Sequence, residues 1–471
     1  MTEAFGGAAV FCGGAGEVKG RQTGWGSAML NRFQNPTQVL ATCFGSVILL
    51  GTLLLRLPIA TTSGESADWV SALFTATSAV CVTGLAIVDT GGHWSAFGEG
   101  VIAGLVQIGG FGIMILATLF TMIVSNRMGL RARLMAQAQT STLTVADARR
   151  VVRNVIVFSL VSEAVVAVIL TGRLMIGYGE SFGTALYHGV FHAISAFNNA
   201  GFSLWPDSLT RFVSDPWICL TIAGAVIVGG LGVPVIFELL RSWRRPSRWT
   251  VLTRVTVVVT TLLLSVSTMV FLMTEWRNPG TLGALKDSDK LLASFFTAVM
   301  PRSSGFNTID VSQMESSSWL VTDILMFVGA GSAGTGGGIK VTTLGLLAFV
   351  IWAEIRGEPQ VNIGHRRLTE SAQRQAVAIC MLGVALVAIT TYVLLIMTPH
   401  SLDQVLFEAV SAFSTTGLST GITPDVPPAG HLMLVVLMFI GRIGPLTLGS
   451  ALALKERTRR YELPEERVIV G

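Results

Sequence analysis

Long apolar runs separated by short polar segments are the dominant pattern along the chain. Eight of these runs are long enough to cross the roughly 30 Å hydrocarbon core of a bilayer as helices. They lie near 39–57, 100–125, 152–176, 216–240, 252–274, 319–352, 375–397 and 430–454. A shorter, half-apolar segment lies between runs 1 and 2, between runs 3 and 4, between runs 5 and 6, and between runs 7 and 8. Such segments are re-entrant or buried against other helices. The pattern predicts an all-α polytopic membrane protein with eight transmembrane helices.

Composition agrees with this fold class. Of the 471 residues, 51% are hydrophobic and 13% are charged, against about 25% charged in soluble domains. This composition excludes secreted, fibrous and disordered proteins and nearly all cytosolic enzymes. The predicted spans also hold no acid–base pair that an intramembrane enzyme would need. The five cysteines are scattered without a C-x-x-C pair, so neither a disulfide framework nor a zinc site is indicated. The mild net charge of +4 does not indicate a nucleic-acid partner.

Charge separates the two sides of the membrane. Segments after the even-numbered spans hold 20 Lys and Arg residues, whereas those after spans 1, 3, 5 and 7 hold 6, together with 15 Asp and Glu residues. The positive-inside rule then predicts a multi-pass protein of the lipid bilayer with cytoplasmic tails at 1–38 and 455–471. The half-apolar segments would enter from outside, where acidic loops attract cations.

The half-apolar segments form an internal repeat. They read FTATSAVCVTGL (74–85), FHAISAFNNAGF (191–202), FFTAVMPRSSGF (295–306) and FEAVSAFSTTGL (407–418), each with a Phe ten residues before a Gly. A second glycine element lies inside each following span: IGGFG (108–112), VGGLGVP (228–234), VGAGSAGTGGG (328–338) and IGRIGP (440–445). The unit is therefore span, pore-type helix, glycine loop and a span interrupted by glycine. Four units predict a pseudo-fourfold pore: repeat 1 (39–125), repeat 2 (152–240), repeat 3 (252–353) and repeat 4 (375–454).

This unit has the physical properties of an ion filter. The C-terminal end of a short helix carries about half a negative charge, which favours a cation. The loop that follows must aim backbone carbonyls inward to replace the water shell of the ion, and glycine accepts the positive φ that this requires. The candidate K⁺ ligands are the carbonyls of four filter segments: Val82, Thr83, Gly84; Asn199, Ala200, Gly201; Ser303, Ser304, Gly305; and Thr415, Thr416, Gly417. The alternative is that these glycines are helix-packing contacts.

Span 6 contains a stretch that is too rich in glycine for a stable helix, because each glycine costs about 1 kcal/mol relative to alanine. Irregular backbone at that depth must be buried in protein or line water, so the 329–338 loop is a candidate gate, with an inert packing break as the alternative. Arg442 inside span 8 costs at least about 2.5–3.5 kcal/mol to insert and must face water or a partner. The candidate gate residues are Gly329, Gly331, Ser332, Gly334, Thr335, Gly336, Gly337, Gly338, Lys340 and Arg442. The alternative for Lys340 is an anchor at the cytoplasmic end of the span. The alternative for Arg442 is an arginine that snorkels or forms a salt bridge for packing.

The motifs VCVTGL (80–85), FNNAGF (197–202), GFNT (305–308), GLSTGITP (417–424) and GSAGTGGGIK (331–340) resemble the Trk/Ktr/HKT superfamily of K⁺ transport proteins, over roughly 36–454. Eight spans are most similar to the KtrB-type membrane subunits of bacterial Ktr systems. The resemblance implies K⁺ conduction down its gradient across the bacterial plasma membrane, often with some Na⁺ influence. It also implies a homodimer with one pore per subunit, gated by a cytosolic nucleotide-binding subunit of the RCK type (KtrA-like). Arg442 matches the pore-facing arginine below the filter.

The chain departs from the family pattern in the third filter segment. It reads Pro301-Arg302-Ser303-Ser304-Gly305, where Thr-Ala is expected before the glycine. Carbonyls coordinate the ion, so little change in selectivity is expected. Gly329-x-Gly331-x-x-Gly334 fits a dinucleotide fingerprint but follows no strand, so no nucleotide site is expected in this chain. The alternative function is a secondary K⁺/Na⁺ symporter, since broken helices also mark transporters.

Overall fold

The computed structural model describes residues 36–127, 145–332, 334–358, 360–363 and 366–444. The predicted tail 455–471, most of tail 1–38 and the end of the predicted span 430–454 lie outside these residues. The α-helices are α2 (Pro36–Leu55), α3 (Trp69–Val80), α4 (Thr90–His93), α5 (Ala96–Arg127), α7 (Val145–Tyr178), α8 (Phe182–Phe197), α9 (Pro216–Leu231), α10 (Val233–Ser242), α11 (Val251–Glu275), α12 (Asp287–Val299), α13 (Ser316–Phe327), α14 (Val341–Ile355), α15 (Glu370–Met397), α16 (Leu402–Ser414) and α17 (Pro428–Ile443). Two short strands, β1 (Asn362–Ile363) and β2 (Arg366–Arg367), form an antiparallel pair. Single 3-10 turns lie at Pro58–Ala60, Thr210–Phe212, Pro246–Arg248, Leu282–Ala284, Val311–Gln313 and Thr423–Asp425.

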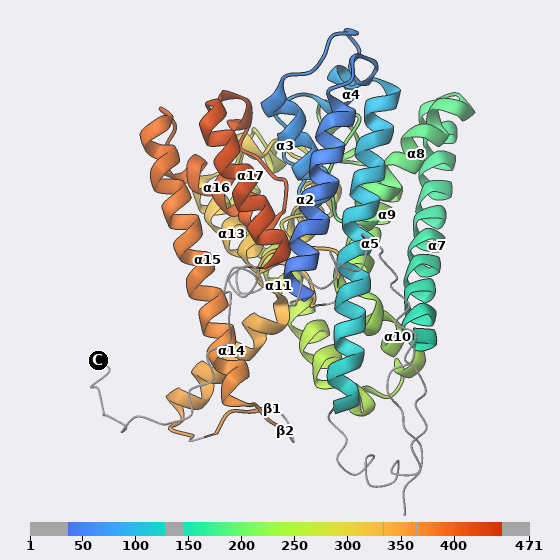
Figure 1. Ribbon diagram of the computed structural model, residues 1–471. Helices are drawn as coiled ribbons and strands as arrows, with labels where there is room; N and C mark the ends of the chain where they lie inside the picture. Colours follow the sequence, from blue (N-terminus) through green and yellow to red (C-terminus); the bar gives the residue numbers. More distant parts are fainter. Residues whose placement is uncertain (1–35, 128–144, 333, 359, 364–365, 445–471) are drawn as a thin grey trace, which may run out of the picture.

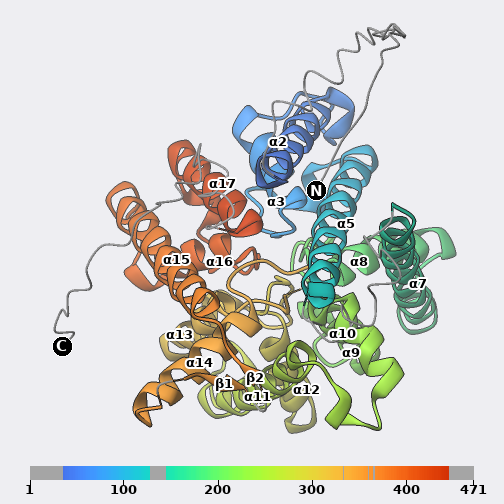
Figure 2. The ribbon, with the colours of Figure 1, turned by 60° about the horizontal axis from the view of Figure 1, so that its bottom comes forward.

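The longer helices lie side by side along one axis of the molecule (Figure 1). Viewed closer to that axis, the helices follow one another around the molecule in sequence order: α2 to α5, α7 to α10, α11 to α14, and α15 to α17 (Figure 2). The last group closes on the first, because α17 packs against α3. The described chain is therefore arranged as a ring of four helical groups.

The half-apolar segments fold as short helices inside this ring. α3, α8 and α16 each pack against two helices of their own group, and α12 packs against α11 of its group and α9 of the preceding one. Three of them begin with a side-chain cap, at Asp68, Ser181 and Ser401, and Ser401 forms a full capping box with Gln404. These caps satisfy amide groups that a helix start leaves unpaired. The consecutive buried residues at the end of α3 and of α16 place those helix ends in the protein interior.

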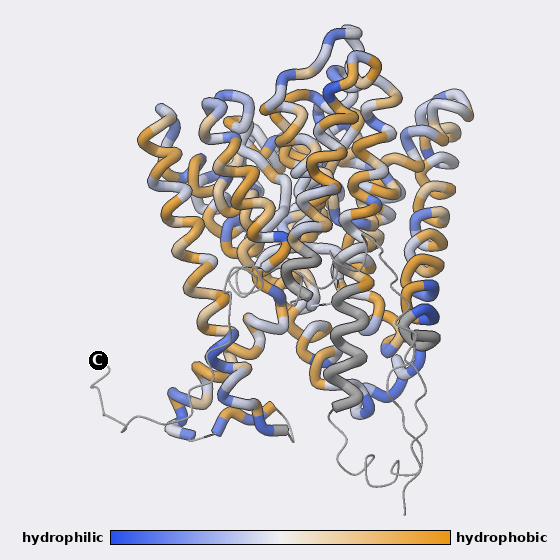
Figure 3. The backbone as a smooth tube through the Cα atoms, viewed as in Figure 1, coloured by the Kyte–Doolittle hydropathy of each residue, from blue (hydrophilic) through white to orange (hydrophobic). Residues whose placement is uncertain are grey.

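Apolar residues cover the middle of the helices, and hydrophilic residues gather toward both ends (Figure 3). Among the described residues, three helices are long and apolar enough to cross a membrane, over Arg149–Tyr178, Val251–Glu275 and Glu370–Met397. A fourth span is possible if α9 and α10, which are bent by 100°, count as one. Shorter apolar helical stretches among the described residues are Ala41–Leu55, Trp69–Val80, Ala96–Gly112, Val341–Ile355 and Pro428–Ile443.

The predicted interruption of spans by glycine is wrong for span 2 and correct for spans 4 and 6. α5 runs unbroken through residues 108–112. In span 4, Gly232 separates α9 from α10 with a φ of 88°, which a side chain would oppose. In span 6, residues 328–340 separate α13 from α14. α17 ends before Gly444, whose φ is 93°.

Candidate filter and the loop beneath it

The four filter segments lie against one another in a closed cycle. A Cβ atom built on each filter glycine would collide with a carbonyl oxygen of the next segment. The pairs are Gly84 with Ala200, Gly201 with Ser304, Gly305 with Thr416, and Gly417 with Thr83. The last pair returns to the first segment, so segments more than 100 residues apart in sequence surround a common centre. All four glycines lie outside the helices, and their closest neighbours are backbone atoms of the adjacent segment.

The backbone of each filter segment alternates between positive and negative φ. The glycines have φ values of 91°, 73°, 71° and 91°, in chain order. The residue two positions earlier is also left-handed in every segment, at Val82 (56°), Asn199 (61°), Ser303 (72°) and Thr415 (49°). A β-branched residue such as Val82 or Thr415 rarely adopts positive φ and does so only where its surroundings impose it. In extended backbone successive carbonyls point to opposite sides, whereas this alternation turns neighbouring carbonyls toward one side.

Hydrogen bonds to the preceding helix hold three of the segments in the same way. The amide nitrogens of Thr83, Ala200 and Thr416 donate to the carbonyls of Ser78, Ser195 and Ser411, at 2.7, 2.7 and 2.9 Å. The Ser78 and Ser411 hydroxyls also accept from the amides of Gly84 (3.0 Å) and Gly417 (3.1 Å). A serine lies six residues before the filter glycine in three of the four repeats, but the sequence pattern did not reveal its role.

The third segment is built differently. Its serine position holds Val299, and the amide of Ser304 donates instead to Met300, four residues back, at 3.1 Å. The Arg302 side chain is buried and donates to the Thr260 hydroxyl of α11 at 3.1 Å. The departure seen in the sequence therefore changes how the segment is held.

A cavity of about 350 Å³ lies on one side of the cycle. Its lining includes all four filter glycines and the residues that follow them, among them Ser203, Asn307 and Ser419. Nearby, the Arg211 guanidinium pairs with Asp207 at 2.6 Å and hydrogen-bonds the carboxylate, which lowers the pKa of Asp207. The cavity is an open vestibule that ends at the glycines.

One glycine in each of α5, α9 and α17 brings its helix close to a short helix. A Cβ atom on Gly109, Gly229 or Gly441 would collide with the carbonyl oxygen of Val80, Phe197 or Phe413, in that order. These carbonyls all lie four residues before a filter glycine. The glycines of α5 therefore serve close packing, which explains why α5 contains them without breaking.

The 329–338 loop lies directly against the filter segments, on the side away from the vestibule. The Thr335 hydroxyl is 3.0 Å from the side-chain amide of Asn199. The backbone of Gly336 and Gly337 lies so close to Ser303 and Thr415 that a Cβ on either glycine would overlap them. The loop is held to α9 as well, through hydrogen bonds from Gly331 to Gly230 (2.8 Å) and from Thr335 to Gly229 (3.1 Å).

Arg442 and Lys340 both donate hydrogen bonds to this loop. The buried guanidinium of Arg442 donates to the Thr335 carbonyl and, at 3.1 Å, to the Gly109 carbonyl of α5. The ammonium of Lys340 donates to the Gly336 carbonyl. No carboxylate pairs with Arg442 in the described part of the chain. The salt-bridge alternative for Arg442 therefore finds no partner there, and Lys340 reaches the loop.

Arg442 is distinctive when the four repeats are compared at the residue directly after the first glycine common to their second elements. The equivalent residues are Gly110, Gly230, Ala330 and Arg442. Three repeats thus hold a small residue here, and the fourth holds a long cationic side chain that bridges to repeats 1 and 3. The remaining predicted gate residue with a side-chain contact, Ser332, meets the Thr342 hydroxyl at the start of α14.

Comparisons with known proteins agree with one another. The model of the TrkH family, described as cation transport protein, matches residues 20–456. Ktr system potassium uptake protein B of Bacillus subtilis (strain 168) is 42% identical, over 93% of this chain and 97% of that protein. The protein of the same name from Vibrio alginolyticus is 38% identical, over 92% and 94%. Potassium/sodium uptake protein NtpJ of Enterococcus hirae is 34% identical, over 93% and 97%. The crystal structure of the potassium transporter TrkH from Vibrio parahaemolyticus has the same fold, with a TM-score of 0.68 at 16% identity, over 88% of this chain and 85% of that one.

Proposed function

The chain belongs to the TrkH family of cation transport proteins, and from this premise we propose that it takes up K⁺ across the bacterial plasma membrane through a selective, channel-like filter. The observation that carries the proposal is the closed cycle of four glycine segments, each with the same alternation of φ. The relatives named for potassium uptake support K⁺ as the ion.

In this mechanism K⁺ enters from the vestibule and exchanges its water for filter carbonyls. The four short helices end at the filter segments, so their C-terminal dipoles favour a cation at the centre. The close packing of neighbouring segments limits how far the carbonyls can move inward around a smaller ion. Selectivity would then follow from the number and spacing of the carbonyls.

The membrane arrangement we propose has eight spans in four repeats. The spans are α2, α5, α7, α9 with α10, α11, α13 with α14, α15 and α17, with α3, α8, α12 and α16 as re-entrant helices. The charge distribution of the loops supports cytoplasmic termini. The vestibule then faces outward and the 329–338 loop faces the cytoplasm.

The 329–338 loop would act as the gate, with Arg442 and Lys340. It packs under the second, third and fourth filter segments, so a cation leaving the filter meets backbone in place of water. The charge of Arg442, which has no carboxylate partner among the described residues, raises the barrier further in a low-dielectric environment. Withdrawal of the loop would open a wet path.

We further propose a homodimer regulated by a separate cytosolic nucleotide-binding subunit of the RCK type, with no nucleotide site in this chain. The Ktr relatives are named as parts of a system, which supports a partner. The potassium/sodium name of NtpJ supports an influence of Na⁺ and keeps a secondary K⁺/Na⁺ symporter as the second candidate.

Rescue of a K⁺-uptake-deficient bacterium on low K⁺ tests the function. We expect growth rescue, and Rb⁺ uptake in proteoliposomes that follows the electrochemical gradient and saturates weakly. A symporter would instead show Na⁺ and K⁺ entering in a fixed ratio, with uphill K⁺ movement driven by a Na⁺ gradient. Absence of any K⁺ or Rb⁺ flux in inserted, folded protein would contradict both.

A further inference from the structure

The residue nine positions before each filter glycine differs in every repeat. It is Thr75 in α3, His192 in α8, Phe296 in α12 and Glu408 in α16. All four are buried. They lie in the short helices behind the filter, where a side chain can reach the segment that follows the glycine.

Two of these residues bind that following segment through its serine. In repeat 2, the His192 Nε2 atom lies 3.2 Å from the hydroxyl of Ser203, two residues after Gly201. In repeat 4, the hydroxyl of Ser419, two residues after Gly417, donates to the Glu408 carboxyl group. In repeats 1 and 3 the position does not make this link: the Thr75 hydroxyl is unpartnered in the described part of the chain, and Phe296 is apolar.

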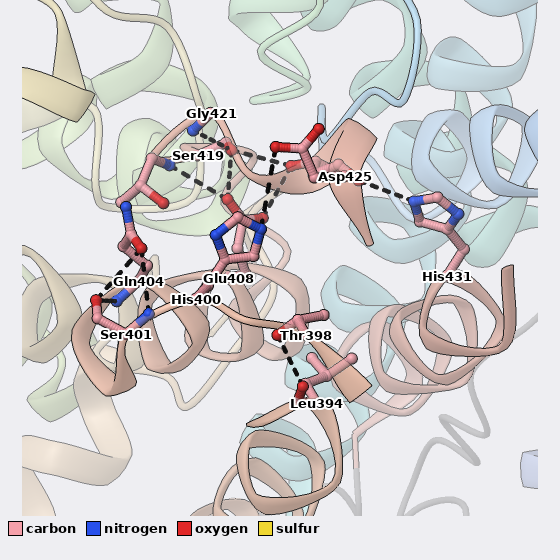
Figure 4. A network of polar contacts seen from close by, with 12 residues as sticks. Leu394, Thr398, His400, Ser401, Gln404, Glu408, Ser419, Gly421, Asp425 and His431 are labelled. Atoms are coloured by element: carbon pink, nitrogen blue, oxygen red, sulfur yellow. Dashed lines mark hydrogen bonds and ion pairs between the residues drawn. The ribbon is translucent and has the colours of Figure 1, made fainter. Parts of the chain in front are cut away.

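The contacts of Glu408 form a small closed network (Figure 4). The Thr423 hydroxyl lies 2.9 Å from the second Glu408 oxygen and 2.9 Å from the Ser419 hydroxyl. The amide of Thr420 donates to the first Glu408 oxygen at 3.2 Å. His431 of α17 extends the network, with Nε2 at 2.8 Å from the Thr423 carbonyl. Glu408 therefore holds both ends of the turn that leaves the fourth filter segment.

Counting protons shows which form of Glu408 closes this network. The three oxygen–oxygen contacts among Glu408, Ser419 and Thr423 need three protons, and the two hydroxyls supply two. A neutral carboxyl group supplies the third. The Glu408 side chain is fully buried, and within the described residues no Lys, Arg or His forms an ion pair with it. An ionised carboxylate here would leave one contact without a proton and a buried charge without a counter-ion.

We propose that Glu408 is a positioning residue for ion selectivity, and that it acts as a neutral hydrogen-bonding group buried behind the wall of the vestibule. This inference rests on the proposed function of the filter. By fixing Ser419 and Thr423, Glu408 fixes the direction in which the chain leaves Gly417, and with it the outermost carbonyl of the fourth segment. Ser419 itself lines the vestibule.

The test compares Glu408→Gln with Glu408→Ala in the full-length protein. The Gln side chain offers a carbonyl acceptor and an NH2 donor group where the neutral acid offers C=O and O–H, so Glu408→Gln should keep wild-type discrimination between K⁺ and Na⁺. Glu408→Ala should lower that discrimination about tenfold, with membrane abundance unchanged, because the Ser419 hydroxyl, the Thr423 hydroxyl and the Thr420 amide all lose their hydrogen-bond partner. Ser419→Ala and Thr423→Val should lower it in the same direction, and Glu408→Ala combined with Ser419→Ala should be less than additive. Thr75→Val, at the matched position of repeat 1, serves as the control with no expected change.

The outcomes separate this inference from the proposed function. Wild-type protein that carries no K⁺ contradicts the proposed function itself. A K⁺-selective wild type with unchanged selectivity in Ser419→Ala and Thr423→Val overturns the positioning role, even if Glu408→Ala fails to insert. Glu408→Gln behaving like Glu408→Ala also overturns it, since the charge of Glu408 would then be what matters.

Discussion

The hydroxyl of Ser303 joins the third filter segment to the backbone of Gly337 in the 329–338 loop. The Gly337 amide donates to the Ser303 oxygen at 2.9 Å, and the same hydroxyl donates to the Thr415 carbonyl at 2.9 Å. One side chain therefore connects the proposed gate to two filter segments. The contact comes from the first residue of the tripeptide Ser303-Ser304-Gly305, where the threonine of the expected Thr-Ala-Gly would also present a hydroxyl.

Replacing Ser303 with Ala should weaken the seating of the 329–338 loop. The buried amide of Gly337 would lose its acceptor, at a cost of about 1–3 kcal/mol to the seated form. We expect K⁺ flux without the regulatory partner to rise roughly tenfold, measured as Rb⁺ uptake in proteoliposomes. Ser294→Ala on α12, where the buried hydroxyl has no partner among the described residues, is the matched control. Equal Rb⁺ uptake by the two variants would argue against a role of the Ser303–Gly337 hydrogen bond in seating the loop.

Replacing Gly84 with Ser should reduce K⁺ selectivity. The added Cβ would overlap the Ala200 carbonyl, and the φ of 91° strains any side-chain-bearing residue by about 1–3 kcal/mol. We expect weaker K⁺ affinity and relatively more Na⁺ passage, seen as a fall in the K⁺/Na⁺ uptake ratio on the order of tenfold. Unchanged discrimination would refute the filter assignment.

Replacing Arg442 with Ala should make uptake several-fold faster and less regulated. The change removes a buried positive charge and two hydrogen bonds that hold Thr335 and α5 together. Arg442→Lys keeps the charge but not the paired donors, so it separates electrostatics from loop anchoring. If Arg442→Ala abolishes insertion and Arg442→Lys behaves as wild type, Arg442 is a structural residue.

Deleting Ser332–Gly336 should remove gating. The deletion removes Thr335, whose hydroxyl contacts the Asn199 side chain in the intact chain. We expect K⁺ flux to rise and to become insensitive to the cytosolic partner. Partner-dependent flux in a deletion variant that still inserts would assign gating elsewhere, with Arg442 the next candidate.

Replacing Gly441 with Ala should destabilise the protein rather than change its selectivity. The new methyl group would overlap the Phe413 carbonyl, so α17 and the end of α16 must separate. We expect a lower melting temperature in detergent, with a loss of about 1–3 kcal/mol typical of overpacking. Gly224→Ala on α9, which faces open space, should be neutral or slightly stabilising. Equal melting temperatures of the two variants would contradict the close approach of Gly441 to the Phe413 carbonyl.

Local features of the sequence are enough to predict the membrane class, the four short helices and the spacing of the repeats. These features follow from local properties: apolar length, helix caps, and glycine where side chains are not tolerated. The motifs also identified the family, which the comparisons confirm. The positions of Gly84, Gly201, Gly305 and Gly417 follow from the spacing of the repeat alone.

Which groups meet across the repeats depends on how the chain folds in three dimensions. Glycine elements of similar appearance break the helix at Gly232 but pack α5 unbroken against Val80, because the outcome depends on which backbone atom lies opposite. The contacts of Arg442 with Thr335 and of Ser303 with Gly337 likewise join segments far apart in the chain. Hydrogen bonds act over about 3 Å in space. No periodicity in the sequence therefore encodes such pairs. The buried Glu408 likewise finds its partners Ser419 and Thr423 only in the folded chain.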